Sequence, residues 1–266
     1  METRIFRGGR RAGGIDPGDR GLAYGDGLFE TMRVHRGGIP WLDAHLLRLQ
    51  RGAARLAIEL PEEGLLRTEI ATMCIGRDAA VLKLIVTRGT GGRGYAPSAH
   101  SEPTWLLSLH DAPLPMQEID VAWCKTTLAD QPMLAGIKHC NRLEQVLARR
   151  EVAAANADEG LMCDAPGNVV SATSANLFIH DGDGWLTPEV DRSGVAGVCR
   201  DWLLRHAPAR ETVLGRDTVL RSSAIFLCNA VRGILPVRRL DAREWPASTE
   251  IRDLQRQLAD AHPGLA

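Results

Sequence analysis

The chain has 266 residues, of which 44% are hydrophobic and 24% are charged, an ordinary composition for one large or two modest globular domains. The formal net charge of −1 argues against a nucleic-acid-binding surface, because such surfaces usually carry a marked basic excess. The first residues lack an apolar signal core, and no apolar run approaches the roughly 18 residues of a membrane span. We therefore expect a cytoplasmic protein that acts on small molecules, with no nucleic-acid or membrane partner.

The first part of the chain predicts a domain that mixes strands and helices. We expect strands at residues 3–6, 28–35, 80–87 and 104–110, and helices over 41–58 and from Pro61 to about residue 75. In the second strand, Phe29, Thr31 and Arg33 share one face, and the simplest interpretation of Phe29 is a core residue. Arg48 is a lone arginine on an amphipathic helix, a position that is usually solvated.

The Gly/Arg loop (residues 88–95) follows the third of these strands. It contains four glycines and two arginines among eight residues, so the arginines are its main recognisable groups. Loops of this composition are common on protein surfaces. The pattern alone therefore does not assign a function.

Two prolines in residues 111–115 mark the best linker in the chain. We predict an N-terminal domain over 1–110, a linker over 111–116 and a C-terminal domain over 117–266. The C-terminal domain should contain strands at 119–124, 160–164, 169–171, 176–180, 185–187 and 224–229, with helices over 141–155 and after Ser248. Pro-Gly and Asp-Gly turns between the short strands of 160–187 favour an antiparallel arrangement.

Residues 194–200 combine small side chains with the start of a helix. Backbone N–H groups at a helix N-terminus attract anions, so this segment could hold a phosphate, although glycines commonly precede helices in any case. The six cysteines show no CxxC pair and no zinc-like spacing with histidine. We expect reduced core thiols and no metal.

The lysine segment (residues 134–145) places Lys138 between a Gly-containing apolar turn and a helix. Most lysines before a helix are simply solvated. A lysine held in a partly apolar pocket among other cations can instead lose its proton and act as a nucleophile and then as a base. The residues alone leave both interpretations open.

Residues 136–145, Gly-Ile-Lys-His-Cys-Asn-Arg-Leu-Glu-Gln, resemble the lysine segment of 4-amino-4-deoxychorismate lyases. These are pyridoxal-phosphate (PLP) enzymes of the fold type IV group, which also includes branched-chain and D-amino-acid aminotransferases. Segments 19–31, 45–49, 87–95, 156–159 and 174–178 follow the family's order as well, so the resemblance covers nearly the whole chain.

The resemblance implies an α+β fold with two domains, a smaller N-terminal α/β sandwich and a larger C-terminal β-barrel-like domain with helices. It implies a homodimer in which PLP is bound to Lys138, and a reaction that yields 4-aminobenzoate and pyruvate. The other implied cofactor-binding residues are Arg48, Ser171, Val195, Ala196, Gly197, Val198, Asn229 and Ala230. The implied substrate-binding residues are Phe29, Arg93, Tyr95, Asn141 and Arg142, of which Phe29 would lie beside the cofactor and Arg93 would meet a carboxylate across the dimer interface.

Ser171 departs from the family pattern. Fold type IV enzymes usually have a glutamate at this position, five residues before Asn176, and it bonds to the pyridine nitrogen of PLP. A serine brings no negative charge, which favours lyase chemistry over transamination. A fold type IV aminotransferase and a PLP- or metabolite-binding protein without catalysis are the alternatives.

Overall fold

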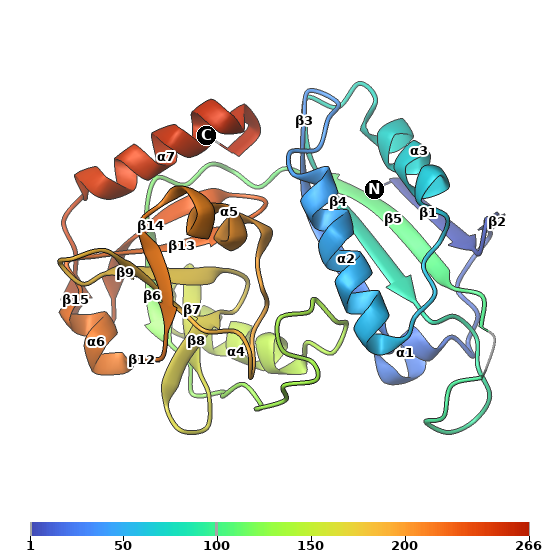
Figure 1. The fold of residues 1–266 in the computed structure, drawn as a ribbon, viewed down its shortest axis with the longest axis horizontal. Coiled ribbons are helices and arrows are strands. Elements are labelled where there is room, and N and C mark those ends of the chain that lie inside the picture. The colour runs from blue at the N-terminus through green and yellow to red at the C-terminus, as the bar shows by residue number, and fades with distance from the viewer. Residues whose placement is uncertain (1, 99–100, 266) are drawn as a thin grey trace. The chain divides into compact units, whose positions relative to one another are not determined.

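The computed structural model describes residues 2–98 and 101–265 (Figure 1). The chain forms two compact units. Unit 1 contains Met1–Pro113 and Ile137–Asn141, and unit 2 contains Leu114–Gly136 and Arg142–Ala266. The predicted α+β class is confirmed, because both units combine sheets with helices.

Unit 1 contains one antiparallel sheet with the strand order β2-β1-β5-β4-β3. Its strands are β1 (Glu2–Arg7), β2 (Arg10–Ala12), β3 (Gly27–His35), β4 (Ala79–Thr87) and β5 (Thr104–Asp111). Its helices are α1 (Arg20–Tyr24), α2 (Leu42–Leu56) and α3 (Glu63–Cys74), and the two longer ones cover one face of the sheet (Figure 1).

The side chains of β3 alternate as the period of a strand requires. Leu28, Glu30, Met32 and Val34 are buried, whereas the residues between them are half-buried. Helix α2 places its apolar stripe against the buried face. Helix α3 begins after Glu62, whose carboxylate accepts hydrogen bonds from the N–H groups of Gly64 and Leu65, so the predicted start at Pro61 was too early.

Unit 2 contains a ten-stranded sheet with the order β11-β10-β9-β13-β14-β6-β7-β8-β12, in which β15 pairs with β14. The strands are β6 (Ile119–Trp123), β7 (Glu159–Cys163), β8 (Asn168–Ala172), β9 (Asn176–His180), β10 (Trp185–Pro188), β11 (Ala209–Thr212), β12 (Leu214–Gly215), β13 (Ala224–Asn229), β14 (Gly233–Leu240) and β15 (Arg243–Glu244). The helices are α4 (Leu143–Ala154), α5 (Val198–His206), α6 (Arg216–Arg221), α7 (Thr249–Ala261) and the 3-10 turn η1 (Pro263–Leu265).

This larger sheet is mixed. The predicted antiparallel pairs β7–β8 and β9–β10 are present, but β6 pairs in parallel with β7 and β14, and β10 pairs in parallel with β11. Local turn signals predict hairpins only. Parallel partners are joined by longer connections, so their pairing leaves no local signal.

The lysine segment departs from the predicted domain division, which assigned all of residues 117–266 to the C-terminal domain. Strand β3 lies at the edge of its sheet, so the backbone groups on its outer side face no neighbouring strand of that sheet. The Phe29 N–H donates to the Lys138 carbonyl at 2.9 Å, and the Cys140 N–H donates to the Gly27 carbonyl at 2.9 Å. Residues 137–141 therefore belong structurally to unit 1.

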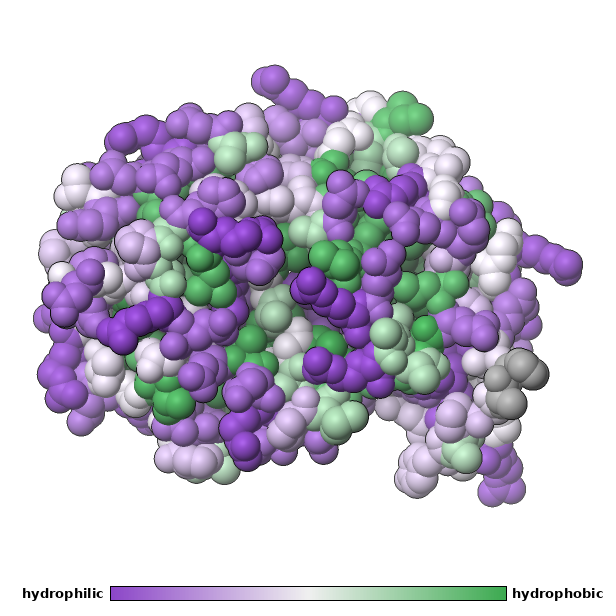
Figure 2. All heavy atoms as spheres, in the orientation of Figure 1, coloured by the Kyte–Doolittle hydropathy of each residue, from purple (hydrophilic) through white to green (hydrophobic). Residues whose placement is uncertain are grey.

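All six cysteines are unpaired, and five of them are buried as predicted, whereas Cys140 is only partly buried. Among residues 2–98 and 101–265, no helix is both long and apolar enough to cross a bilayer. Figure 2 shows hydrophilic side chains over most of the visible face, with apolar side chains in smaller patches between them.

Candidate active site

Lys138 is half-buried and lies over an aromatic ring. Its Nζ is 4.3 Å from the centroid of Phe29, and the preceding residue, Ile137, is only 4% exposed. The backbone pairing of residues 138–140 with β3 fixes the position from which the Lys138 side chain extends. This is a partly apolar environment for an amine, unlike that of a solvated lysine.

Phe29 is not a core residue, since it lies on the half-buried face of β3. A second amine approaches the same ring, because Lys83 Nζ of β4 is 5.4 Å from its centroid. Arg33 shares this face, and its Nε is buried without a hydrogen-bond partner among the residues that the structure describes. Lys83 was not predicted as a site residue, although a lysine in the middle of a mostly apolar strand was a signal.

The opposite face of β3 carries a buried polar cluster of Glu30, His45 and Arg48. Arg48 donates from Nε and Nη2 to the two carboxylate oxygens of Glu30, at 2.9 and 2.5 Å. His45 Nδ1 is 2.6 Å from the same carboxylate, and both Glu30 and His45 are almost completely buried. Glu30 thereby fixes the plane of the Arg48 guanidinium, the group predicted to bind a phosphate.

The pKa shifts of Glu30 and His45 show that the Glu30 contacts with Arg48 and with His45 differ in kind. Burial alone would raise the pKa of Glu30, but the charge of Arg48 and the hydrogen bonds from His45 and Arg48 outweigh it and lower the pKa to about 2. Burial lowers the pKa of His45, and the Arg48 and Lys138 charges act in the same direction. At neutral pH, His45 is therefore a neutral donor to a charged carboxylate, and the ion pair is between Glu30 and Arg48.

In unit 2, the predicted phosphate segment forms a turn over residues 194–198 that leads into helix α5. The Ala196 N–H donates to the Gly136 carbonyl at 3.0 Å, and Asn176 Nδ2 donates to the Val195 carbonyl at 2.9 Å. Gly197 is the N-cap of α5, and a Cβ atom there would lie 2.1 Å from Asn176 Oδ1. A larger residue at 197 would therefore displace the Asn176 side chain, and Gly197 and Val198 lie where helix N–H groups have no intrahelical acceptor.

The remaining predicted cofactor residues lie in unit 2 as well. Ser171 is 8% exposed on β8, where it pairs with Met162 of β7. Asn229 ends β13, and its Oδ1 accepts hydrogen bonds from the N–H groups of Val231 and Arg232. Asn229 thus stabilises the turn that contains Ala230.

The predicted substrate-binding residues are divided between the units. Arg93 and Tyr95 are exposed in the Gly/Arg loop, and Asn141 Nδ2 donates to the Gly25 carbonyl at 3.2 Å, all within unit 1. Arg142 is the N-cap of α4 in unit 2. Lys138, Phe29 and the Glu30 cluster are the site residues that unit 1 brings together.

Glu159 of β7 has several partners within unit 2. Its carboxylate accepts hydrogen bonds from the hydroxyls of Thr173 and Ser174 and from the Gly160 N–H, and it pairs with Arg149. These contacts join β7 to the turn before β9.

A model of class IV aminotransferases matches residues 27–240, which is most of the chain. The chain belongs to this family. Among structures of class IV members and their relatives, the 4-amino-4-deoxychorismate lyase of Pseudomonas aeruginosa is 43% identical, with a TM-score of 0.90 and coverage of 96% of this chain and 98% of that one. The fold type IV architecture expected from the sequence is thereby confirmed.

Related sequences include both lyases and aminotransferases. The aminodeoxychorismate lyase of Vibrio harveyi is 32% identical over 91% of this chain and 93% of its own length. A putative branched-chain-amino-acid aminotransferase of Methanocaldococcus jannaschii is 30% identical over 85% of this chain and 82% of its own length. Class IV membership alone therefore does not select the reaction.

Proposed function

We propose that this protein is a PLP-dependent lyase that converts 4-amino-4-deoxychorismate to 4-aminobenzoate and pyruvate. The observation that carries the proposal is the near full-length similarity, at 43% identity, to the Pseudomonas aeruginosa lyase. The position of Lys138 over the Phe29 ring gives this similarity a chemical basis.

The residues of this chain fit PLP. Lys138 offers a partly desolvated primary amine, which can bond to an aldehyde. The 194–198 turn offers backbone N–H groups at the start of a nine-residue helix, where Gly197 has no side chain to cover the backbone. Arg48 has a planar guanidinium that suits phosphate, and its two hydrogen bonds to Glu30 fix the orientation of that guanidinium. When bound, PLP supplies a carbonyl carbon for the substrate amine and a ring that withdraws electrons.

Lys138 is the proposed proton-transfer base. Its Nζ takes the proton from the ring carbon that carries the substrate amine, and the electron pair left behind forms a ring double bond as the C–O bond to the enolpyruvyl group breaks. The departing enolpyruvate gains a proton and becomes pyruvate, and the ring becomes aromatic. Aromatisation supplies the driving force.

The substrate carries two carboxylates, and this chain offers several cations for them. Arg93 is the cation of the Gly/Arg loop, with Tyr95 beside it. Lys83 and Arg33 lie on the sheet face of Phe29, and the buried Nε of Arg33 lacks an acceptor among the described residues. Asn141 and Arg142 follow Lys138 closely in the chain and serve as further polar contacts.

The decisive experiment is turnover without a 2-oxo acid. Purified protein loaded with PLP should produce 4-aminobenzoate and pyruvate in equal amounts, and Lys138→Ala should abolish both products and the visible absorption band. A protein that stays colourless after addition of PLP, or that turns over only with an amino acceptor, would contradict the proposal. The second result would favour an aminotransferase, the candidate supported by the 30% identical relative of Methanocaldococcus jannaschii.

The protein is further proposed to act as a homodimer in which the Gly/Arg loop reaches the partner's site. Its four glycines and the exposed Arg93 and Tyr95 suit a loop that meets another surface. Mixing Arg93→Ala with Lys138→Ala subunits should restore up to about a quarter of wild-type activity, because random pairing places both intact residues in one of four sites. Mixed dimers without any rescue would exclude the crossing loop.

A further inference from the structure

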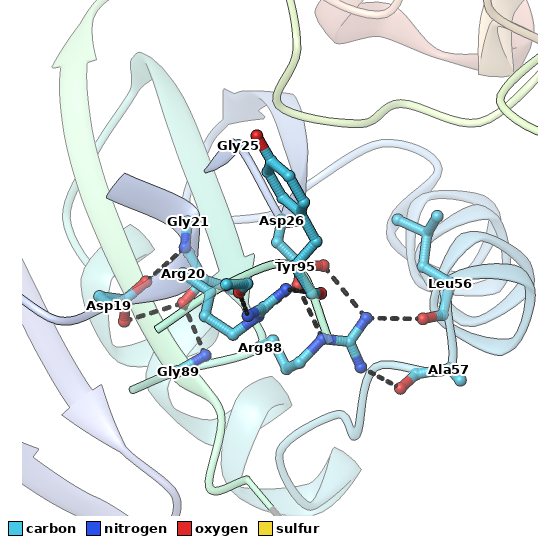
Figure 3. Close-up of polar contacts among 12 residues, drawn as sticks. Asp19, Arg20, Gly21, Gly25, Asp26, Leu56, Ala57, Arg88, Gly89 and Tyr95 are labelled. Carbon is cyan, nitrogen blue, oxygen red and sulfur yellow. Dashed lines mark hydrogen bonds and ion pairs between the residues drawn. The ribbon is translucent and has the colours of Figure 1, made fainter. Parts of the chain in front are cut away.

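Asp26 joins two arginines at the base of the Gly/Arg loop (Figure 3). Arg20 Nε donates to Asp26 Oδ2 at 2.9 Å, and Arg88 donates to both carboxylate oxygens, at 2.8 and 3.1 Å. The side chains of Arg20, Arg88 and Asp26 are 5%, 10% and 15% exposed. Two cations thus share one carboxylate in a mostly buried cluster.

The remaining donors of the two arginines bind backbone carbonyls. Arg20 donates from Nη1 to the Gly94 carbonyl at 3.0 Å and from Nη2 to the Tyr95 carbonyl at 2.7 Å. Arg88 donates to the carbonyls of Leu56 and Ala57, at 2.8 and 2.5 Å, where the last carbonyls of α2 have no intrahelical donor. The Arg88 contacts anchor the near end of the Gly/Arg loop to α2, and the Arg20 contacts hold its far end.

The fit between Arg20 and the loop is tight. The Arg20 N–H donates to the Gly89 carbonyl at 2.9 Å, and a Cβ atom at Gly91 would lie 2.7 Å from Arg20 Cδ. The Arg20 guanidinium lies 4.9 Å from the Tyr24 ring, which in turn is 5.5 Å from the Tyr95 ring. Gly91 thus lets the loop backbone lie directly against the Arg20 side chain.

The charges of the cluster support a fixed geometry. Burial alone would raise the pKa of Asp26, but the hydrogen bonds and charges of Arg88 and Arg20 outweigh it and lower the pKa. Asp26 therefore stays ionised near neutral pH. The loop end that Arg20 holds carries Arg93 between Gly92 and Gly94, exposed, with no ion pair identified for it in the described structure.

We propose that Arg20 is a positioning residue for the substrate: it fixes the backbone at Gly94 and Tyr95 so that the exposed Arg93 is presented to a substrate carboxylate. This inference rests on the proposed lyase function. Arg20 does not touch the substrate itself, because its side chain is only 5% exposed and each of its three nitrogens donates within the cluster. A guanidinium can bond Asp26 and two carbonyls at once, whereas the single ammonium of a lysine cannot match this planar fork.

The test compares Arg20→Gln and Arg20→Lys with Arg4→Gln in the PLP-loaded enzyme. Arg4 is a suitable control because it is also a partly buried arginine of unit 1, paired with Glu69 at 2.7 Å and 19% exposed. Loss of loop anchoring should raise KM for aminodeoxychorismate at least tenfold in both Arg20 variants and change kcat less than about threefold. The visible band of bound PLP should be retained, and Arg4→Gln should leave KM unchanged.

Limited trypsin digestion measures how firmly the Gly/Arg loop is held, independently of enzyme activity. Cleavage after Arg93 should be at least tenfold faster in the Arg20 variants than in wild type and unchanged in Arg4→Gln. Equal cleavage rates, or a loss of kcat without a change in KM, would overturn the proposal. If Arg20→Gln does not fold, Arg20→Lys alone decides. If wild type produces no 4-aminobenzoate, the lyase function fails, and the trypsin comparison still decides whether Arg20 anchors the loop.

Discussion

Lys138 Nζ lies 4.3 Å from the centroid of the Phe29 ring. An aromatic face favours an ammonium by about 0.5–1 kcal/mol at exposed sites, so this ring stabilises the charged form of the lysine. Bonding to PLP requires the neutral amine. Phe29→Leu should therefore speed the appearance of the visible band, after PLP is added to the apoprotein at pH 7, by about two- to fivefold. Phe29→Tyr keeps the ring face and should match wild type, and a Leu variant no faster than the Tyr variant would contradict this role.

The buried Glu30 should make the stability of the protein depend on acid pH. Its folded-state pKa of about 2 lies below the ordinary 4.5, so its contribution is complete above pH 4.5 and is lost as the pH falls toward 2. His45 adds to this loss of stability. Its pKa is lower in the folded protein than the ordinary 6.5, so as the pH falls below 6.5 the unfolded chain binds a proton that the folded protein does not yet bind. Glu30→Gln should cost about 3–5 kcal/mol at pH 7 and flatten the dependence between pH 4.5 and 2.

Urea unfolding at pH 7, 4.5 and 3 measures this effect. Glu63→Gln is the control, since Glu63 pairs with Arg67 on an exposed face and should cost less than about 1 kcal/mol. A Glu30→Gln protein with the stability and pH dependence of wild type would show that the cluster is energetically unimportant.

Gly197→Ala should weaken cofactor binding. The added methyl group would meet Asn176 Oδ1 at 2.1 Å and displace the side chain that holds the Val195 carbonyl. We expect the Kd for PLP to rise at least tenfold, equivalent to about 1.4 kcal/mol. Gly215→Ala is the matched control, because a Cβ atom there has no neighbour within 4 Å. If the two variants have the same Kd for PLP, the 194–198 turn does not belong to the cofactor site.

Ser171→Glu tests why a serine replaces the usual glutamate. Ser171 is 8% exposed on β8, so a carboxylate there would be mostly buried and would favour a protonated pyridine nitrogen. Lyase turnover should stay within about tenfold of wild type, or 1.4 kcal/mol of barrier, while trace transamination rises. Ser171→Gln separates charge from size and should not raise transamination. A much larger gain in lyase activity would show that the native site is impaired and would favour a protein that only binds PLP.

The sequence by itself determined the elements whose signals are local. The alternating residues of β3, the apolar stripe of α2 and the pattern after Ser248 predicted β3, α2 and α7 to within a few residues. The ordered motifs, with Lys138 at their centre, also predicted the fold type. These signals are readable because strand and helix periods are set by residues only two to four positions apart.

Only the tertiary structure decided what these residues contact. The pairing of Lys138 with β3 joins positions more than 100 residues apart, and the binding of Arg20 to the Gly94 and Tyr95 carbonyls joins positions more than 70 apart. No local period encodes such contacts. They depend on an open sheet edge that accepts a strand, and on buried charges that must find partners once water is removed. The same requirement paired Arg48 with Glu30, where the helix pattern alone favoured solvent.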